Sequence, residues 1–514
     1  MTKVLIIGSG FAGLSAACCL AAEGMEVEVF EKNDQPGGRA RLLETGGFKF
    51  DMGPSWYWMP DVFERFFNNF GKRASDYYDL KKLDPSYSVF FEDAAIEIPS
   101  GEQNVIHLFE TIEKGAGDKL YKFLREAEYK YQVGIEELVY KPSLSYLEFA
   151  DWRLAKSSLR LDVFNSLSSH VKKYFKNPKL IQLLEFPVLF LGAMPSKIPA
   201  LYSLMNYADI TLGTWYPMGG MYKVVEGMTR LAESLGVKFY LNSQVDKILV
   251  NSSGESYGIN VTGSEIKGDV IIGGADYHHV EQNLLEKNFR TYSENYWDSK
   301  TLAPSCLIFY VGLNKKLKKL THHNLFFDAD FTKHAEEIYL TKEWPSNPLF
   351  YVCCPSKTDG SVAPPGCENL FVLIPTAVGL SDNEELREKY FQLVMKRMEK
   401  VAGESIIPFV QFKKSYAGSD FVSDYNSYKG NAYGLANTLS QTAILRPSIK
   451  SKKVKNLYYT GQLTVPGPGV PPALISGQVV ATQIFKDLNQ FNSASKLFSS
   501  SKTLKKHGIV STTL

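Results

Sequence analysis

Three glycines near the start of the chain have a spacing that could bind phosphate. Gly8, Gly10 and Gly13 form GxGxxG, in which the first glycine permits a tight turn, the second leaves backbone open to a diphosphate, and the third lets a helix approach a sheet. The free N–H groups at that helix start attract anions. Glu31 follows about 20 residues later, where a carboxylate can accept ribose hydroxyls. The pattern predicts a dinucleotide site that disfavours a 2′-phosphate; the alternative is a structural turn with a solvated glutamate.

A second glycine turn follows at residues 35–39, Gln-Pro-Gly-Gly-Arg. Gly37 and Gly38 can bring main chain close to a bound cofactor, and Arg39 can offer its forked guanidinium to a phosphate. The alternative for Arg39 is a solvated loop residue. A later glycine- and proline-rich segment, 461–472, stands between an apolar run and a helix-like stretch.

Hydropathy patterns predict the elements that would hold the first motif. The apolar residues 4–7 are typical of a parallel strand buried on both faces, and they meet Gly8 directly. Small side chains then recur at helical spacing from Gly13 to Leu20, and residues 27–30 alternate as a second strand. A strand, a helix and a strand within about 30 residues form the unit from which doubly wound folds are built.

The rest of the chain alternates between helical and strand patterns. Helices are predicted over 61–71, 111–131, 161–175, 220–235, 382–401 and from 472 to about 488. Strands are predicted over 237–240, 245–250, 269–276, 307–311, 349–353, 370–374 and 457–461. The strands between 300 and 440 fit a second, mainly antiparallel sheet.

The second glycine turn with Arg39 resembles the extended FAD signature of amine-oxidase-like flavoproteins, which plain NAD dehydrogenases lack. Residues 50–55, 215–220 and 461–477, in this order, resemble bacterial phytoene desaturases of the carotenoid desaturase family, and 326–328 and 431–434 are similar to two further segments. The resemblance extends from residue 3 to about 488. Val465 stands where that family commonly has a histidine, so no histidine acts at this position.

This resemblance implies an α/β fold, with a Rossmann-type FAD-binding domain on a parallel sheet and an inserted substrate domain of mainly antiparallel sheet and helices. The FAD-binding domain is expected from 1–75, 220–300 and 440–490, the substrate domain from 76–219 and 301–439, and a flexible tail from 491–514. The expected cofactor-binding residues are Gly8, Gly10, Gly13, Glu31, Lys32, Gly38, Arg39, Gly53, Val245, Gly461, Gly467, Gly469, Val470 and Pro471.

The implied reaction is FAD-dependent desaturation of phytoene or a similar linear carotenoid, towards lycopene or neurosporene. A hydride passes to flavin N5 and a neighbouring proton is lost, so the cofactor performs the hard step. No catalytic side chain stands out, because surface ion pairs explain Asp209 and Glu185 equally well. A long polyene hydrocarbon binds by apolar burial, which favours a tunnel. Candidate tunnel residues, with plain core as their alternative, are Phe186, Phe190, Tyr202 and Met205.

The expected partners follow from the same hydrocarbon. A substrate dissolved in lipid implies peripheral membrane contact, while no run of eighteen apolar residues and no cleavable signal is present, so a cytoplasmic location is expected. No second dinucleotide motif is visible, which favours a quinone or oxygen as electron acceptor. The formal charge of +2 is too small to indicate a nucleic-acid partner.

Metal binding is not expected. The six cysteines include no CxxC pair with a histidine at ligand spacing. Two histidine pairs, 278–279 and 322–323, are adjacent in sequence, and neighbouring side chains point in different directions in a helix or a strand. A shared metal site is therefore not predicted for either pair.

Two alternatives to desaturation remain open. A carotenoid isomerase or saturase of the same fold would use reduced flavin. A non-catalytic escort protein for prenyl lipids would bind an isoprenoid chain without turnover, although the intact Glu31 and the Gly37-Gly38-Arg39 turn argue against it.

Overall fold

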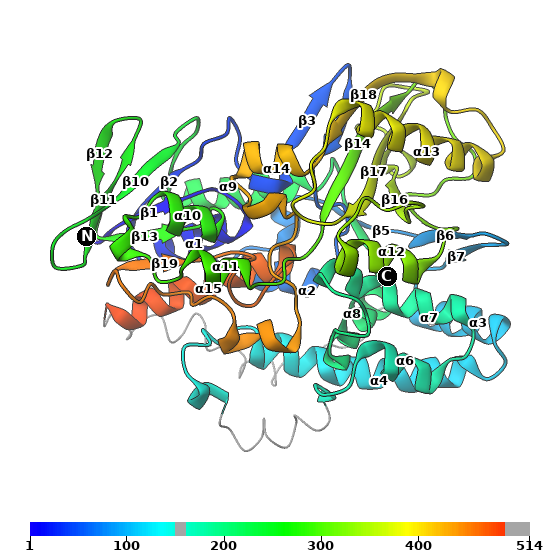
Figure 1. Cartoon of the computed structure of the whole chain (residues 1–514), viewed down its shortest axis with the longest axis horizontal. Helices are drawn as coiled ribbons and strands as arrows, with labels where there is room; N and C mark the ends of the chain where they lie inside the picture. Colours follow the sequence, from blue (N-terminus) through cyan, green and yellow to red (C-terminus); the bar gives the residue numbers. More distant parts are fainter. Residues whose placement is uncertain (150–160, 489–514) are drawn as a thin grey trace.

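A parallel sheet occupies one end of the molecule (Figure 1). The computed structural model describes residues 1–149 and 161–488, so the predicted tail lies outside the described residues. The strand order is β19-β13-β1-β2-β9, with each neighbouring pair parallel. Val4, Leu5 and Ile6 of the central strand are fully buried, as a strand covered on both faces requires. The strands are β1 (Lys3–Ile7), β2 (Glu26–Phe30), β9 (Lys238–Tyr240), β13 (Val270–Gly273) and β19 (Leu457–Tyr459).

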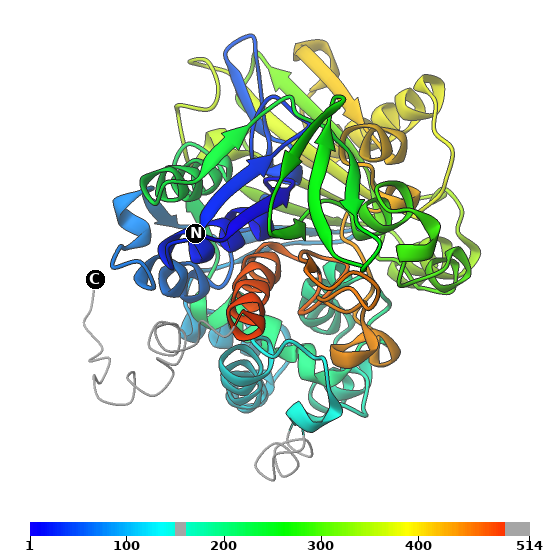
Figure 2. The same ribbon diagram turned by 90° about the vertical axis from the view of Figure 1, so that its left-hand side faces the viewer.

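Helices from both ends of the chain pack together on this sheet. The predicted helix after the first glycine motif is α1 (Phe11–Ala22), and it packs against α9 (Tyr222–Ser234) and α15 (Val470–Asp487). Figure 2 shows α15 in red beside the blue N-terminal elements. A Cβ atom at Gly477 would lie 2.3 Å from the Ala12 carbonyl oxygen. Only glycine permits this approach of the two helices.

The opposite face of the sheet supports a second core. Val4 and Ile6 turn towards α1, whereas Leu5 and Ile7 turn towards the antiparallel strands β10, β11 and β12 and the short helices α10 and α11. This alternation is the period of two that a strand imposes. The elements are β10 (Val245–Val250), β11 (Ser256–Val261), β12 (Ser264–Lys267), α10 (Tyr277–Asn283) and α11 (Glu294–Asp298).

The predicted second sheet is present, in the order β18-β14-β17-β16-β15-β6-β7. Its pairs are antiparallel apart from β15 with β6, which run parallel. One face packs on α13 (Glu384–Ala402). The strands are β6 (Tyr87–Phe91), β7 (Ala95–Ile98), β14 (Ser305–Leu313), β15 (His323–Phe327), β16 (Phe350–Cys353), β17 (Glu368–Thr376) and β18 (Val410–Tyr416). The predicted α/β architecture is confirmed.

A helical layer lies under the second sheet in Figure 1. The helix predicted over 111–131 is present from residue 116 onwards, but its first two residues belong to a separate helix that ends at Ile112. The chain breaks between the two helices because Gly115 adopts a left-handed φ of 79° and the Glu110 carboxylate accepts the Gly115 and Gly117 N–H groups at 2.9 and 3.0 Å. The helices are α2 (Pro60–Asn68), α3 (Glu102–Ile112), α4 (Ala116–Val133), α6 (Leu167–Tyr174), α7 (Pro178–Glu185) and α8 (Leu204–Asn206).

Smaller elements connect the two sheets. The hairpin β3–β4 comes from the predicted FAD-binding segment, yet the Lys49 N–H of β4 donates to the Val362 carbonyl beside the second sheet, at 2.9 Å. The predicted division into two domains stays a prediction. The remaining elements named here are β3 (Leu42–Thr45), β4 (Phe48–Asp51), β5 (Leu80–Lys82), β8 (Trp215–Pro217), α12 (Phe331–Glu336) and α14 (Gly418–Tyr425).

Candidate functional site

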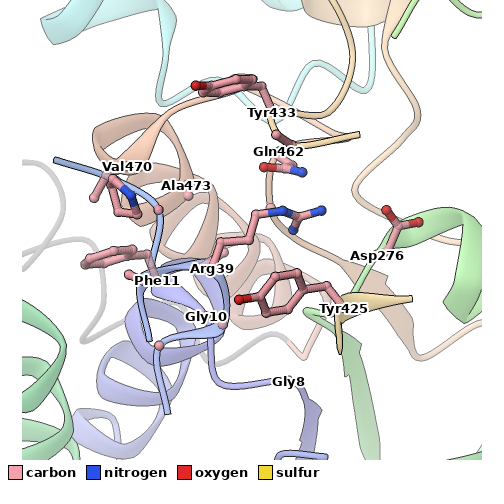
Figure 3. Close-up of a pocket in the computed structure, with 18 of the residues that line it drawn as sticks. Gly8, Gly10, Phe11, Arg39, Asp276, Tyr425, Tyr433, Gln462, Val470 and Ala473 are labelled. Carbon is pink, nitrogen blue, oxygen red and sulfur yellow. The ribbon is translucent and has the colours of Figure 1, made fainter. Parts of the chain in front are cut away.

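A cavity of about 370 Å³ lies at the carboxyl ends of the parallel strands (Figure 3). Residues that follow four neighbouring strands line it: Gly8 after β1, Glu31 after β2, Asp276 after β13 and Gly461 after β19. Open parallel sheets bind ligands at this edge, because the loops that follow the strands converge there. The tertiary structure thus brings the two ends of the chain to one site.

The first glycine motif has the geometry that its spacing predicts. Gly8 has a φ of 95°, and a Cβ atom at Gly13 would lie 2.2 Å from the Gly8 carbonyl oxygen, so α1 begins in direct contact with the turn. A Cβ at Gly10 would meet no atom within 4 Å, and Gly10 lines the cavity. The N-terminus of α1 therefore presents free N–H groups to an open space, which suits an anionic group.

Glu31 is buried and already has four hydrogen bonds. One carboxylate oxygen accepts the amide and hydroxyl of Ser9 at 3.0 and 2.8 Å, and the other accepts the backbone and side-chain amides of Asn33, both at 2.9 Å. A carboxylate has about four acceptor sites. A ribose hydroxyl can therefore bind Glu31 only where one of these donors moves away, and the Ser9 hydroxyl is the one free to rotate.

Arg39 crosses the cavity (Figure 3). Its Nη2 donates to the Ser427 hydroxyl at 3.0 Å and to the Asn431 carbonyl at 3.3 Å, and its guanidinium carbon lies 5.4 Å from the centre of the Tyr425 ring. Burial lowers the pKa of Arg39, while nearby Asp276 raises it. The buried Nε has no partner among the described residues. An unpaired cationic donor in the cavity fits a phosphate of FAD.

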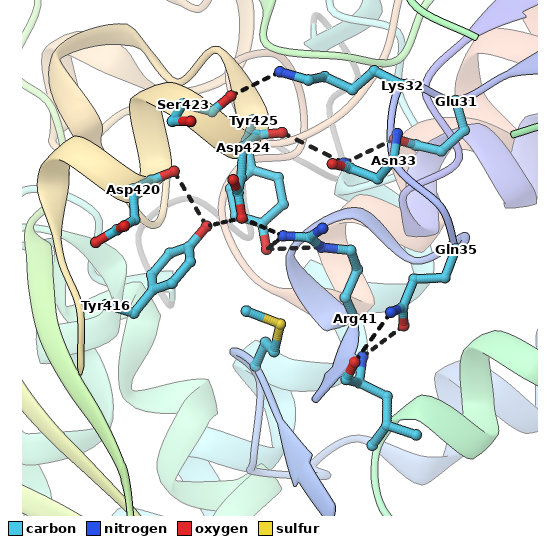
Figure 4. A network of polar contacts seen from close by, with 12 residues as sticks. Glu31, Lys32, Asn33, Gln35, Arg41, Tyr416, Asp420, Ser423, Asp424 and Tyr425 are labelled. Atoms are coloured by element: carbon cyan, nitrogen blue, oxygen red, sulfur yellow. Dashed lines mark hydrogen bonds and ion pairs between the residues drawn. The ribbon is translucent and has the colours of Figure 1, made fainter. Parts of the chain in front are cut away.

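A polar network joins residues 32–41, which contain the second glycine turn, to α14 (Figure 4). The Lys32 amine donates to the Ser423 carbonyl at 2.7 Å. Arg41 forms an ion pair with Asp424, and the Tyr416 hydroxyl donates to the same carboxylate at 2.9 Å. Burial lowers the pKa of Lys32. The end of the cavity beside Glu31 and Lys32 is thus closed by a segment adjoining the second sheet.

Most predicted cofactor-binding residues lie in the cavity wall, and two do not. The residues in the wall are Gly8, Gly10, Glu31, Lys32, Gly38, Arg39, Gly53, Val245, Gly461, Gly469, Val470 and Pro471. Gly13 lies behind the turn against Gly8, and a Cβ at Gly467 would meet the Asn437 amide at 2.8 Å. Both therefore shape the backbone without facing the cavity.

The other half of the cavity is apolar. Its wall includes Trp56, Trp58, Met59, Met205, Ile308, Tyr351, Leu373 and Tyr433. A second hollow of about 70 Å³ shares Tyr351, Leu373 and Tyr433 with it. Of the predicted tunnel residues, Met205 lines the cavity and Phe186 the second hollow, whereas Tyr202 lines neither. The Phe190 side chain lies outside the described part of the structure.

No carboxylate or charged base lines this apolar half in the part of the chain that the structure describes. Asp209 is buried behind Trp58, where it accepts from Tyr87 and Thr214 at 2.8 and 3.1 Å, and burial raises its pKa to about 7. His334 lines the second hollow; its Nδ1 accepts the Leu349 N–H at 3.0 Å, and burial lowers its pKa to about 4. That no catalytic side chain can be assigned stays a prediction.

Sequence reasoning missed several cavity residues. Asp276 lies two residues after a glycine pair that ends a buried strand, a position that could have identified it. Asp424 and Tyr425 approach the cavity only through the packing of α14, and no local pattern marks them.

The two histidine pairs differ in geometry. His278 stacks on the Tyr428 ring at 3.9 Å, while His279 lines the cavity, so these neighbours point apart as expected. His322 and His323 have ring centres only 4.5 Å apart. The expectation that adjacent histidines point apart is wrong for this pair, because His322 precedes β15 and lies outside its alternation.

Comparison with known sequences shows the family to which the chain is related. The model of the flavin containing amine oxidoreductase family matches residues 11–485. Carotenoid 3,4-desaturase of Haloarcula japonica is 42% identical over 487 residues, which cover 94% of this chain and 98% of the relative. The 4,4′-diapophytoene desaturase (4,4′-diaponeurosporene-forming) of Staphylococcus haemolyticus is 32% identical, over 94% and 99% of the two chains. The zeta-carotene-forming phytoene desaturase of Myxococcus xanthus is 29% identical, over 94% and 93%.

Solved structures share the fold. An oxidoreductase from Methanosarcina mazei aligns with a TM-score of 0.60 at 17% identity, over 93% of this chain and 100% of that one. A redesigned putrescine oxidase aligns with a TM-score of 0.59 at 14% identity, over 94% and 99%. Within the described residues, no helix has both the length and the apolar character needed to span a bilayer. The chain belongs to the flavin containing amine oxidoreductase family, in its carotenoid desaturase group, and is an FAD-dependent oxidoreductase.

Proposed function

We propose that this protein desaturates a linear carotenoid, phytoene or a similar polyene. The observation that supports this most directly is the division of one cavity into two halves. Glycine turns and charged side chains gather at the strand ends, and much of the remaining wall is aromatic and aliphatic. A cofactor with a charged diphosphate and a substrate with no polar group would meet in such a cavity.

The polar half is suited to the adenosine diphosphate part of FAD. Arg39 Nε and the N-terminus of α1 would bind the diphosphate, and Glu31 would accept ribose hydroxyls in place of Ser9. The segment from Gly461 to Pro471 would lie beside the rest of the cofactor. When bound, FAD supplies the hydride acceptor for an allylic C–H bond.

The apolar half would bind and orient the hydrocarbon. Burial of apolar surface contributes roughly 25 cal/mol per Å², so a long chain needs no polar contact to bind tightly. Aromatic side chains such as Trp56 and Tyr433 exclude water from the reacting carbons. Because this wall carries no carboxylate among the described residues, no side chain of the wall is assigned as the base for the proton that leaves the substrate.

Membrane contact is part of the proposal, at the cytoplasmic face and without a spanning segment. Tyr146, Leu147 and Phe164 are 70%, 82% and 81% exposed, and large exposed apolar side chains favour a lipid surface. Electrons would then leave the reduced flavin for a membrane quinone or for oxygen.

Pigment analysis tests the reaction. Expression in a bacterium that accumulates phytoene should yield coloured carotenoids of longer conjugation on chromatography. Because a relative is named carotenoid 3,4-desaturase, the same assay should include linear carotenoids that are already conjugated. Recovery of every supplied carotenoid unchanged would overturn the proposal.

Two further measurements separate the alternatives. Anaerobic incubation with photoreduced FAD should leave the substrate unchanged; an isomerised but not desaturated product would identify an isomerase. Purified protein should be yellow with flavin absorbance, whereas a colourless chain that carries an isoprenoid would identify an escort protein.

Vesicle flotation tests the membrane contact. The triple variant Tyr146→Glu, Leu147→Glu, Phe164→Glu should lose most binding to phospholipid vesicles. Leu340 is 62% exposed and lies on a different part of the chain, so Leu340→Glu is a matched control that should still float. Equal flotation of both variants would contradict this surface.

A further inference from the structure

A buried cluster behind the cavity wall contains three potential metal ligands. His323 in β15 is the cross-strand partner of Cys353 in β16, so both side chains lie on the same face of the second sheet. His322 precedes the strand, and its ring centre lies 4.5 Å from that of His323. One ligand atom from each of the three residues lies within 4.8 Å of those of the other two.

The imidazoles are held in the manner of metal ligands. The Nδ1 of His322 shares a hydrogen bond of 2.7 Å with the Thr358 hydroxyl, and the Nδ1 of His323 shares one of 2.6 Å with the Tyr351 hydroxyl. The Nε2 atoms of both rings are buried and have no hydrogen-bond partner among the described residues. A ligating histidine commonly has its other nitrogen fixed by such a contact.

The two unpaired nitrogens lie in a buried environment, where a polar atom needs a partner. His322, His323 and Cys353 are 4%, 0% and 2% exposed. Trp56 stacks on His323 with ring centres 4.0 Å apart, and Tyr216 lies edge-on to His322 at 4.6 Å. A buried polar atom without a partner destabilises the folded protein, so two in one cluster indicate a missing ligand.

We propose that His322, His323 and Cys353 form a binding site for a thiophilic d¹⁰ metal ion, Zn²⁺ or Cu⁺. Imidazole and thiolate are ligands that both ions accept, whereas Mg²⁺ and Ca²⁺ require oxygen. Metal–nitrogen and metal–sulfur bonds of about 2.0 and 2.3 Å place ligands about 3.5 Å apart, so the most widely separated ligand atoms must approach each other by up to about 1 Å. Binding forms a metal–sulfur bond and releases the Cys353 thiol proton to solvent.

The site would stabilise the cavity from behind. Trp56 and Tyr351 contact the cluster through His323 and also line the cavity. A bound ion would fix the orientation of His323 and of the two rings against it. The proposal does not depend on the identity of the substrate.

Metal content of the flavin-loaded protein tests the site. Protein dialysed against Zn²⁺, or against Cu⁺ under anaerobic reducing conditions, should retain one equivalent by mass spectrometry. Cys353→Ser and His323→Gln should lower affinity by about 100-fold or more. X-ray absorption at the metal edge should show one sulfur ligand in the wild type. Of Zn²⁺ and Cu⁺, the ion that the protein retains at the lower free concentration is the one that the site binds more tightly.

Cys354→Ser is the matched control, because Cys354 is an equally buried neighbour whose sulfur lies 3.5 Å from the Ser356 hydroxyl, outside the cluster. It should bind metal as the wild type does. Flavin absorbance and thermal unfolding report whether each variant is folded, and a rise in the wild-type melting temperature on metal addition provides a second readout. Wild-type protein that retains no more metal than Cys353→Ser, with no shift in melting temperature, would overturn the site and leave a buried water as the partner of the two nitrogens.

Discussion

Arg41 and Asp424 lie 383 positions apart in the sequence and form an ion pair. This pair joins the segment that follows the second glycine turn to α14. The Arg41 guanidinium also lies 5.1 Å from the centre of the Tyr425 ring, and Tyr425 lines the cavity. The Arg41 and Asp424 side chains are only 11% and 33% exposed, so solvent screens their interaction weakly. The contact therefore connects cofactor binding to the position of the second sheet.

Breaking this pair should reduce stability. A double-mutant cycle on Arg41→Met and Asp424→Asn should give a coupling free energy of about 1–2 kcal/mol in urea unfolding, because the hydrogen bonds involve charged groups. Lys455 and Glu255 form a far more exposed pair, 67% and 49%, and the same cycle there should give less than about 0.5 kcal/mol. Equal coupling at the two pairs would contradict a buried connection.

Arg39 should distinguish cofactors that carry phosphate from those that do not. Arg39→Met should lower FAD affinity by about 10- to 100-fold, the loss expected for hydrogen bonds to a charged group. Riboflavin has no phosphate, so its affinity should be unchanged. Fluorescence titration of the apoprotein measures both, and a parallel loss for the two ligands would assign Arg39 a purely structural role.

The Ser9 hydroxyl occupies Glu31 at the position where the proposed ribose would bind. Ser9→Ala removes the hydroxyl that occupies the carboxylate at 2.8 Å, so FAD should bind as tightly as to the wild type or more tightly, whereas Glu31→Gln should weaken binding by about tenfold. Ser15 is a buried serine of α1 that donates to the Leu474 carbonyl at 2.7 Å, and Ser15→Ala controls for the loss of a hydroxyl. Weaker binding by Ser9→Ala alone would show that this hydroxyl contacts the cofactor.

His334 should make the protein sensitive to acid. Burial lowers its pKa to about 4 from 6.5, so between these values the unfolded chain binds a proton that the folded chain does not. Stability therefore falls as the pH falls through this window, by about 2 kcal/mol from pH 7 to pH 5. In urea unfolding, the loss of stability between pH 7 and pH 5 should be smaller in His334→Gln than in the wild type, by about this amount. His107 is exposed, so His107→Gln should behave as the wild type. An identical fall in all three proteins would contradict the assignment.

Local patterns predicted much of the cofactor half. The strand before Gly8, the helix after Gly10 and the strand before Glu31 are present as β1, α1 and β2, because glycine turns and hydrophobic periodicity act over a few residues. The start of the helix predicted over 111–131 was misplaced, since a left-handed glycine at 115 and the Glu110 carboxylate interrupt an otherwise continuous helical pattern.

The two glycine turns and the residue at the end of β2 were determined by the sequence alone, because a tight turn admits few residue types and its spacing is visible without the fold. The family resemblance assigns Gly8 and Gly461 to one cofactor site. Only the tertiary structure decided that Asp424 closes the cavity and that His322, His323 and Cys353 meet behind its wall. Such contacts depend on strand pairing and helix packing over hundreds of residues. No short-range pattern encodes which distant surfaces bury each other, since burial depends on the whole core.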